Sequence, residues 1–398
     1  MSIYADNAAT TKMSRNALDA YMKTSDNCYG NPSSVHSHGQ KASNLLFSAR
    51  KVIGTLIGAN VQEEVIFTSG GSESDTQAIM TGAEYGKKYG KTKIISSSFE
   101  HHAVINALNS LKNEGFEIVL IDPDKDGIVQ PESLEKVIDD NTALVSIMMA
   151  NNEIGTIQPV RTLAETAHRH NALFHTDAVQ AIGHIPFSAK EYGVDMMSAS
   201  AHKFNGPRGV GILYVKAGLR ASKIIYGGHQ ENDSRAGTEN LPGIAAMAAA
   251  LKDSVLDMKQ NIEYVSSLRD KLTEEILTIP NTILVGDRKR RVPGIMNFVF
   301  EGIEGEALLL MLDSRGISAS SGSACTAGSL DPSHVLKSLG MTDNLTHGSI
   351  RISLSHENTE DEIIEIGKAV KECVSKLRDM SETWQEIQSG IRKSEIDN

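Results

Sequence analysis

Short apolar runs alternate with amphipathic stretches along most of the chain. A helix is expected over residues 39–57, where the apolar side chains share one helical face. The runs typical of buried strands span residues 64–68, 93–98, 116–121, 143–150, 172–178, 196–200 and 211–215. Helical or turn-like stretches separate most of these strands. The pattern therefore predicts an α/β fold with a mainly parallel central sheet.

The composition changes after Leu241-Pro242-Gly243, where an alanine-rich run leads into a long amphipathic helix that reaches Ile276. Such a helix could bridge two domains. Beyond it, strands are expected at 282–285, 295–300 and 349–354 and helices at 305–314 and 360–377, a mixture typical of a smaller α+β domain. A chain of 398 residues also exceeds the usual size of one hydrophobic core. We expect a large domain over 14–255 and a small domain made of 1–13 plus 256–398.

The composition argues against some classes of binding partner. With 40% hydrophobic and 22% charged residues, the chain is typical of soluble globular proteins. The formal net charge of -11 argues against nucleic acid or a membrane surface as the main partner, because both carry negative charge. No apolar run approaches the length of a membrane span and no signal-peptide pattern opens the chain, so we expect a cytoplasmic protein.

The cysteines are too few and too scattered for a disulfide framework or a four-ligand zinc site. No resident metal is expected. Cys325 lies among small residues from 318 to 330, few of which could anchor it in a core, so we expect an exposed thiol and a candidate nucleophile. Cys28 and Cys373 are interpreted as structural.

Lys203 ends the apolar run that begins at Asp195, and a turn rich in glycine and proline follows it. A lone lysine is most often an ordinary solvated side chain. This lysine, however, leaves a core strand among small hydrogen-bonding neighbours. A desolvated lysine has a lowered pKa and can form a Schiff base with a carbonyl cofactor.

A candidate anion site follows the strand at 65–68, where the glycine- and serine-rich turn 69–74 precedes a helix. The free N–H groups and the dipole of a helix N-terminus favour an anion there. A plain turn with a serine N-cap is the alternative. The turn lacks the lysine and spacing of a Walker A loop, so a nucleoside triphosphate is not expected.

Polar side chains also follow three other strands. Asp177 and Gln180 come at the end of one strand, and an acid there could keep a pyridinium nitrogen protonated. A carboxylate that caps the next helix is an equally simple interpretation. His101 and Asn152 end two further strands and could reach the same crevice.

Eight short motifs follow one another along the chain, at residues 6–11, 30–34, 68–75, 100–101, 151–155, 177–180, 200–203 and 321–325. Together they resemble the motifs of the pyridoxal-phosphate cysteine desulfurases. The resemblance runs from about Tyr4 to Trp384 and indicates the branch with a long cysteine-bearing loop, which serves iron–sulfur cluster assembly and other sulfur-delivery pathways. It implies the aminotransferase-like type I fold, a cofactor-binding large domain, a small domain that carries the cysteine loop, and a homodimer.

The resemblance also implies a role for each matching residue. Lys203 would carry pyridoxal 5'-phosphate as a Schiff base, while His101 would stack on its ring and shuttle protons. Asp177 would pair with the pyridine nitrogen, Gln180 with the phenolic oxygen, and Asn152 would lie beside the ring. The phosphate would be held by Gly71, Ser72, Ser200 and His202, with Thr238 from the neighbouring subunit.

The implied reaction converts L-cysteine to L-alanine. Arg351, with help from Asn31, would bind the substrate carboxylate, since a guanidinium binds carboxylates bidentately. Cys325 would accept the sulfur as a persulfide and pass it to an iron–sulfur scaffold or another acceptor protein, and could transiently ligate an iron–sulfur cluster. A selenocysteine lyase is the alternative activity. A catalytically silent scaffold subunit is disfavoured, because Lys203, Asp177 and Cys325 are all present.

Overall fold

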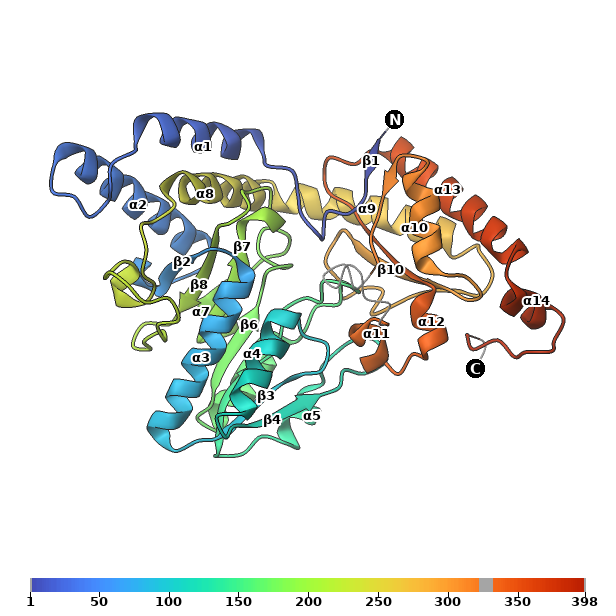
Figure 1. The fold of residues 1–398 in the computed structure, drawn as a ribbon, viewed down its shortest axis with the longest axis horizontal. Coiled ribbons are helices and arrows are strands. Elements are labelled where there is room, and N and C mark those ends of the chain that lie inside the picture. Colours follow the sequence, from blue (N-terminus) through green and yellow to red (C-terminus); the bar gives the residue numbers. More distant parts are fainter. Residues whose placement is uncertain (1, 322–331, 397–398) are drawn as a thin grey trace.

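A central sheet of seven strands organises the larger part of the molecule (Figure 1). The computed structural model describes residues 2–321 and 332–396. The strand order is β2-β8-β7-β6-β5-β3-β4. The strands from β4 to β7 pair in parallel, and β8 is antiparallel to both of its neighbours. The predicted α/β class with a mainly parallel sheet is confirmed. The strands are β2 (Val65–Thr68), β3 (Lys93–Ser97), β4 (Glu117–Ile121), β5 (Thr142–Ser146), β6 (Leu173–Asp177), β7 (Met196–Ser200) and β8 (Gly211–Val215).

Neighbouring residues of each central strand pack on opposite faces of the sheet. Ile94 belongs to a core with α3 (Gly71–Tyr89) and α4 (His102–Lys112), whereas Ile95 belongs to the core beneath α2 (Ser37–Leu56), α6 (Val160–Arg169) and α8 (Leu241–Leu256). Side chains alternate between faces with a period of two residues. Helices cover both faces, so these strands are continuous apolar runs in the sequence.

The predicted long helix is two helices, α8 and α9 (Met258–Ile276). Asp257 ends the first helix and precedes the second, with φ -94° and ψ 2°. The Asp257 side chain makes no capping hydrogen bond to α9. The apolar pattern continues across this residue and does not reveal the interruption. In Figure 1, α8 lies beside α1 (Arg15–Asn27) and α2, whereas α9 runs toward the smaller part of the molecule.

The smaller part has a core of its own around a three-stranded antiparallel sheet. β10 (Ile295–Phe300) lies between β9 (Thr282–Leu284) and β12 (Ser349–Ser353). Its core also takes apolar side chains from α9, α10 (Gly305–Asp313) and α13 (Glu360–Asp379). The N-terminal strand β1 (Ile3–Tyr4) joins this part, because it pairs with β11 (Ile317–Ser318). The domain boundaries near residues 13 and 255 stay predictions.

Short helices complete the fold. No helix within residues 2–321 and 332–396 is both long enough and apolar enough to cross a membrane. The short helices are η1 (Gln62–Glu64), α5 (Pro131–Glu135), α7 (Ala189–Tyr192), η2 (Ala201–Lys203), η3 (Glu231–Asp233), α11 (His334–Ser338), α12 (Asp343–His347) and α14 (Glu382–Gln388).

Candidate active site

A cavity of about 350 Å³ lies where the parallel strands end. Residues that follow β3, β5, β6 and β7 line it, and ligands of open α/β sheets bind at this edge. Most of the residues proposed from the sequence converge here from distant segments. These residues are Gly71, Ser72, His101, Asn152, Asp177, Gln180, Ser200, His202, Lys203 and Arg351.

Two of the proposed residues that the structure describes do not line the cavity. Asn31 is exposed on the loop between α1 and α2, where its side-chain oxygen accepts a hydrogen bond from the Ser33 N–H at 2.9 Å. Thr238 is also exposed and lines a separate cavity of about 190 Å³. Cys325 lies outside the described residues.

The start of α3 leaves backbone donors available. Gly70 precedes the helix, and no side chain caps the helix N-terminus. A Cβ atom on Gly211 of β8 would lie 2.6 Å from the Gly70 Cα, so only a glycine there permits this close approach of β8 to the turn. The uncapped N–H groups and the helix dipole form a suitable site for a phosphate.

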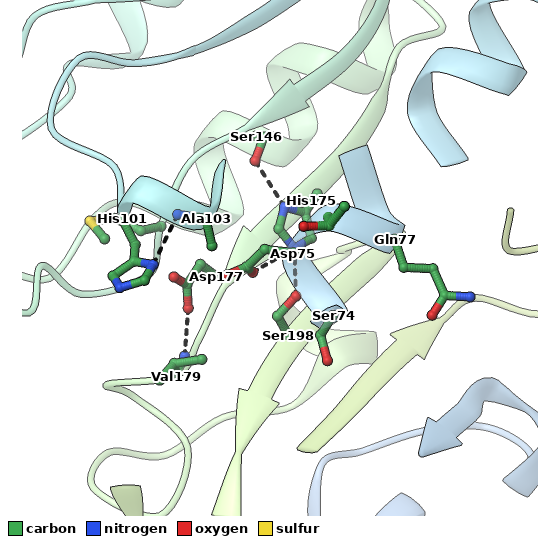
Figure 2. A network of polar contacts seen from close by, with 12 residues as sticks. Ser74, Asp75, Gln77, His101, Ala103, Ser146, His175, Asp177, Val179 and Ser198 are labelled. Carbon is green, nitrogen blue, oxygen red and sulfur yellow. Dashed lines mark hydrogen bonds and ion pairs between the residues drawn. The ribbon is translucent and has the colours of Figure 1, made fainter. Parts of the chain in front are cut away.

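Asp177 is held at the end of β6, as Figure 2 shows. Its Oδ1 accepts a hydrogen bond from the Val179 N–H at 2.9 Å. Burial raises the pKa of Asp177, and the nearby His101 and Lys203 charges oppose that rise. An acid fixed in this way, in a buried site, is suited to pair with a cation such as a pyridinium.

A buried histidine lies on the same strand as Asp177. The two ring nitrogens of His175 contact the hydroxyls of Ser146 at 2.8 Å and Ser198 at 3.0 Å. Burial lowers the pKa of His175 to about 3, so the ring is neutral at neutral pH. The His175 ring therefore links β6 to its two neighbouring strands, β5 and β7.

Asp75 also lines the cavity. It belongs to the motif at residues 68–75, but we assigned it no role from the sequence. Its Oδ1 is buried, accepts no hydrogen bond and lies 3.8 Å from the His175 Nε2 (Figure 2). Burial, followed by the Asp177 charge, raises the pKa of Asp75 well above its ordinary value. Burial and the Asp177 charge therefore both favour the protonated form of Asp75.

His101 lies at the N-terminus of α4 and takes a defined tautomer. Its Nδ1 accepts a hydrogen bond from the Ala103 N–H at 3.1 Å, so a neutral ring carries its proton on Nε2. Burial lowers the pKa of His101, while Asp177 opposes this shift. Burial thus favours the neutral ring, in which His101 can donate or relay the proton on Nε2.

Lys203 contacts backbone carbonyls from the start of the chain. Its Nζ donates to the Ala8 oxygen at 2.6 Å and to the Ala9 oxygen at 3.0 Å. The neighbouring His202 contacts the Thr10 hydroxyl through Nδ1 at 3.2 Å, and burial lowers the pKa of His202 to about 4. Backbone carbonyls have no signature in a sequence, so these contacts could not be predicted.

Arg351 lies on β12 and is 3% exposed. Its Nη1 donates to the Asn152 backbone oxygen at 3.0 Å and its Nη2 to the Asp6 Oδ1 at 2.9 Å. The buried Nε has no acceptor among residues 2–321 and 332–396. A guanidinium at the cavity wall with an unused donor is suited to bind a carboxylate.

The donors and acceptors of the cavity fit pyridoxal phosphate, the cofactor that the sequence resemblance implies. The uncapped N-terminus of α3 can bind a phosphate, and the buried acid can pair with a pyridine nitrogen. The lysine can react with an aldehyde. Among the described residues, no group of three or more His, Cys, Asp or Glu side chains could hold a metal ion.

Comparisons with known proteins identify close relatives over nearly the whole chain. The class-V aminotransferase family matches residues 3–366. A cysteine desulfurase IscS of Methanosarcina thermophila is 43% identical over 380 residues, which is 96% of this chain and 94% of that protein. The solved structure of a NifS-like protein is 36% identical, with a TM-score of 0.88 over 95% of this chain and 100% of the other. A structure of SspA in complex with cysteine is 30% identical, with a TM-score of 0.79 over 90% of this chain and 100% of the other.

Proposed function

This chain belongs to the class-V aminotransferases and, within them, to the pyridoxal-phosphate-dependent cysteine desulfurases, and we propose on that premise that it moves sulfur from L-cysteine to Cys325. The product is L-alanine, and the sulfur leaves as a persulfide for an acceptor protein such as an iron–sulfur scaffold. The observation that supports this proposal most is the convergence of Lys203, Asp177 and Arg351 on one cavity.

The proposed cofactor contacts follow from the donors in the cavity. The start of α3, together with Ser72, Ser200 and His202, would hold the phosphate. Asp177 would pair with the pyridine nitrogen, and Lys203 would carry the cofactor covalently until the substrate binds. Gln180, Asn152 and His101 would contact the ring. When bound, pyridoxal phosphate supplies an electron sink for bonds to the Cα of an amino acid.

The substrate carboxylate binds to Arg351, whose Nε is the unused donor. The Lys203 amine takes the Cα proton, and His101 moves a proton from its Nε2. The Cys325 thiolate attacks the substrate sulfur, so that an S–S bond forms and the C–S bond breaks. The electron pair of the broken bond stays with the carbon part, which takes up one proton at Cβ, regains the Cα proton from the Lys203 amine and leaves as L-alanine.

A homodimer in the cytoplasm is the proposed working form. Apolar side chains are exposed on α1, on α2 and between these helices, including Met22 at 60%, Tyr29 at 73% and Phe47 at 53%. Exposed apolar groups that gather on neighbouring elements are typical of a protein interface. A second copy of the chain would cover these apolar side chains. It would also bring its own Thr238 and Asn31 to the cavity, because neither residue lines the cavity of its own chain.

The proposed sulfur acceptor is tested by mass spectrometry of the protein after brief anaerobic exposure to L-cysteine. We expect a mass increase of one sulfur atom on the peptide that contains Cys325, and none in Cys325→Ala. Cys373→Ala is the matched control, because Cys373 is buried in the small core and should not affect the modification. Alanine formation with no persulfide, or with persulfide only on Cys28, would contradict the proposal.

A further inference from the structure

Residues 6–11, here called the N-terminal segment, contact both parts of the molecule at the cavity. On the small part, Asp6 forms a β-bridge with Ser353, and the Ala8 N–H donates to the Ser353 hydroxyl at 2.9 Å. On the large part, the Ala8 oxygen accepts from the Gln180 side chain at 2.9 Å as well as from Lys203. The segment is therefore a component of the cavity wall.

Asp6 is the charged residue of this segment, and its carboxylate faces Arg351. The Arg351 Nη2 and the Asp6 Oδ1 are 2.9 Å apart, with side chains 3% and 20% exposed. At this depth the pair is only weakly screened by solvent. The net charge of the Asp6–Arg351 pair is zero. The Arg351 Nε nevertheless remains a donor that has no acceptor among the described residues.

We propose that Asp6 determines the charge selectivity of the Arg351 subsite. With Asp6 present, the subsite takes the carboxylate of a zwitterionic amino acid and disfavours an anion that lacks an ammonium group. Asp6 acts through Arg351 and is a specificity-determining residue, not a catalytic one. This inference rests on the proposed role of Arg351 as the carboxylate-binding residue.

The physical reason lies in the two charges of the ligand. A carboxylate that binds Arg351 is repelled by Asp6, whereas the ammonium group on the adjacent carbon is attracted by Asp6. The two effects largely cancel for a zwitterion and leave only the repulsion for a simple anion. Loss of the Asp6 charge should therefore strengthen the binding of anions far more than the binding of amino acids.

The variant Asp6→Asn isolates the charge, because an asparagine oxygen can still accept from the Arg351 Nη2. Binding of 3-methylbutanoate and of N,N-dimethylglycine is measured by titration calorimetry on the holoenzyme, because the two molecules have the same shape and differ by one ammonium group. A tertiary amine cannot form a Schiff base with the cofactor, so this ammonium group stays intact. In Asp6→Asn, we expect the Kd for 3-methylbutanoate to fall about tenfold, which corresponds to about 1.4 kcal/mol. The Kd for N,N-dimethylglycine should change by less than about threefold.

Three further variants make the result specific. Asp6→Glu keeps the charge and should retain the discrimination of the unaltered protein. Asp6→Ser is a second uncharged variant and should behave as Asp6→Asn does. Asp19→Asn removes the same charge from the exposed Arg15–Asp19 pair on α1 and should change neither Kd.

The inference is overturned if 3-methylbutanoate binds Asp6→Asn and Asp6→Ser no more tightly than it binds the unaltered protein. It is also overturned if the two ligands gain or lose affinity equally. Arg351→Ala separates this failure from that of the proposed function. If Arg351→Ala binds 3-methylbutanoate and N,N-dimethylglycine normally, then Arg351 is not the carboxylate-binding residue, and both proposals lose their substrate subsite.

Discussion

Gly71 shows how the absence of a side chain positions the cofactor site. A Cβ atom at this position would lie 2.8 Å from the Val179 Cγ2. Val179 would have to move, and its N–H holds the Asp177 carboxylate. An alanine at position 71 therefore disturbs the acid that we propose to pair with the cofactor.

Gly71→Ala should raise the Kd for pyridoxal phosphate about tenfold, which corresponds to about 1.4 kcal/mol. Val179→Ala in the same chain removes the clash and should restore most of that affinity, as equilibrium dialysis of all four combinations would measure. Independent, additive effects of the two substitutions would contradict this explanation, because residues in contact are expected to couple.

The sequence predicts the positions of charged residues that end strands. It does not predict the roles of charged residues that depend on contacts formed in the folded chain. Lys203 and Asp177 directly end apolar runs, so the sequence indicates where they lie. Asp75 and Asp6 have no such signal, because their effects depend on contacts with His175 and Arg351 that only the folded chain creates. The aspartates lie in motifs that we recognised, but no pattern in those motifs gives them a role.

The buried carboxyl group of Glu100 joins the ends of strands β3 and β5. The Met148 N–H donates to both oxygens of Glu100, at 2.9 and 3.1 Å, and the Ser97 hydroxyl donates as well. Burial nevertheless raises the pKa of Glu100 to about 8 from 4.5. Between these values the folded chain holds a proton that the unfolded chain has lost, so its stability falls as the pH rises.

This linkage predicts a pH-dependent effect of Glu100→Gln. From about pH 5 to about pH 8, the free energy of unfolding of the unaltered protein should fall relative to the variant, by at most about 1.4 kcal/mol per pH unit. Denaturant unfolding at fixed protein concentration measures the difference. Equal pH slopes for the two proteins would show that Glu100 is ionised across this range in the folded chain.

The sequence predicts the longer strands and helices well, but it does not predict the shortest ones. The seven strands of the large sheet were predicted to within a few residues, because both faces of the sheet are covered and the runs are apolar throughout. The pairing of β1 with β11 involves two residues on each strand and leaves no periodic signal. The break at Asp257 was missed because the apolar pattern continues on both sides of it.

For the whole molecule, the proposed homodimer predicts the effect of a charge on the exposed apolar side of α2. Phe47→Asp should convert a dimer into monomers and weaken cofactor binding, because Thr238 of the second copy would be lost from the cavity. Ile364→Asp places the same charge on the exposed side of α13, where the side chain is 68% exposed, and should remain dimeric. Sedimentation of an unaltered protein as a monomer would contradict the proposal.

The most direct test of the whole account is anaerobic turnover of L-cysteine with a thiol reductant, followed for both products. The unaltered protein should release alanine and sulfide in equal amounts, and Cys325→Ala should lose both, because the C–S bond breaks only when a thiolate takes the sulfur. Equal release of both products by Cys325→Ala at the unaltered rate would contradict the account. So would a protein that binds pyridoxal phosphate and forms no alanine.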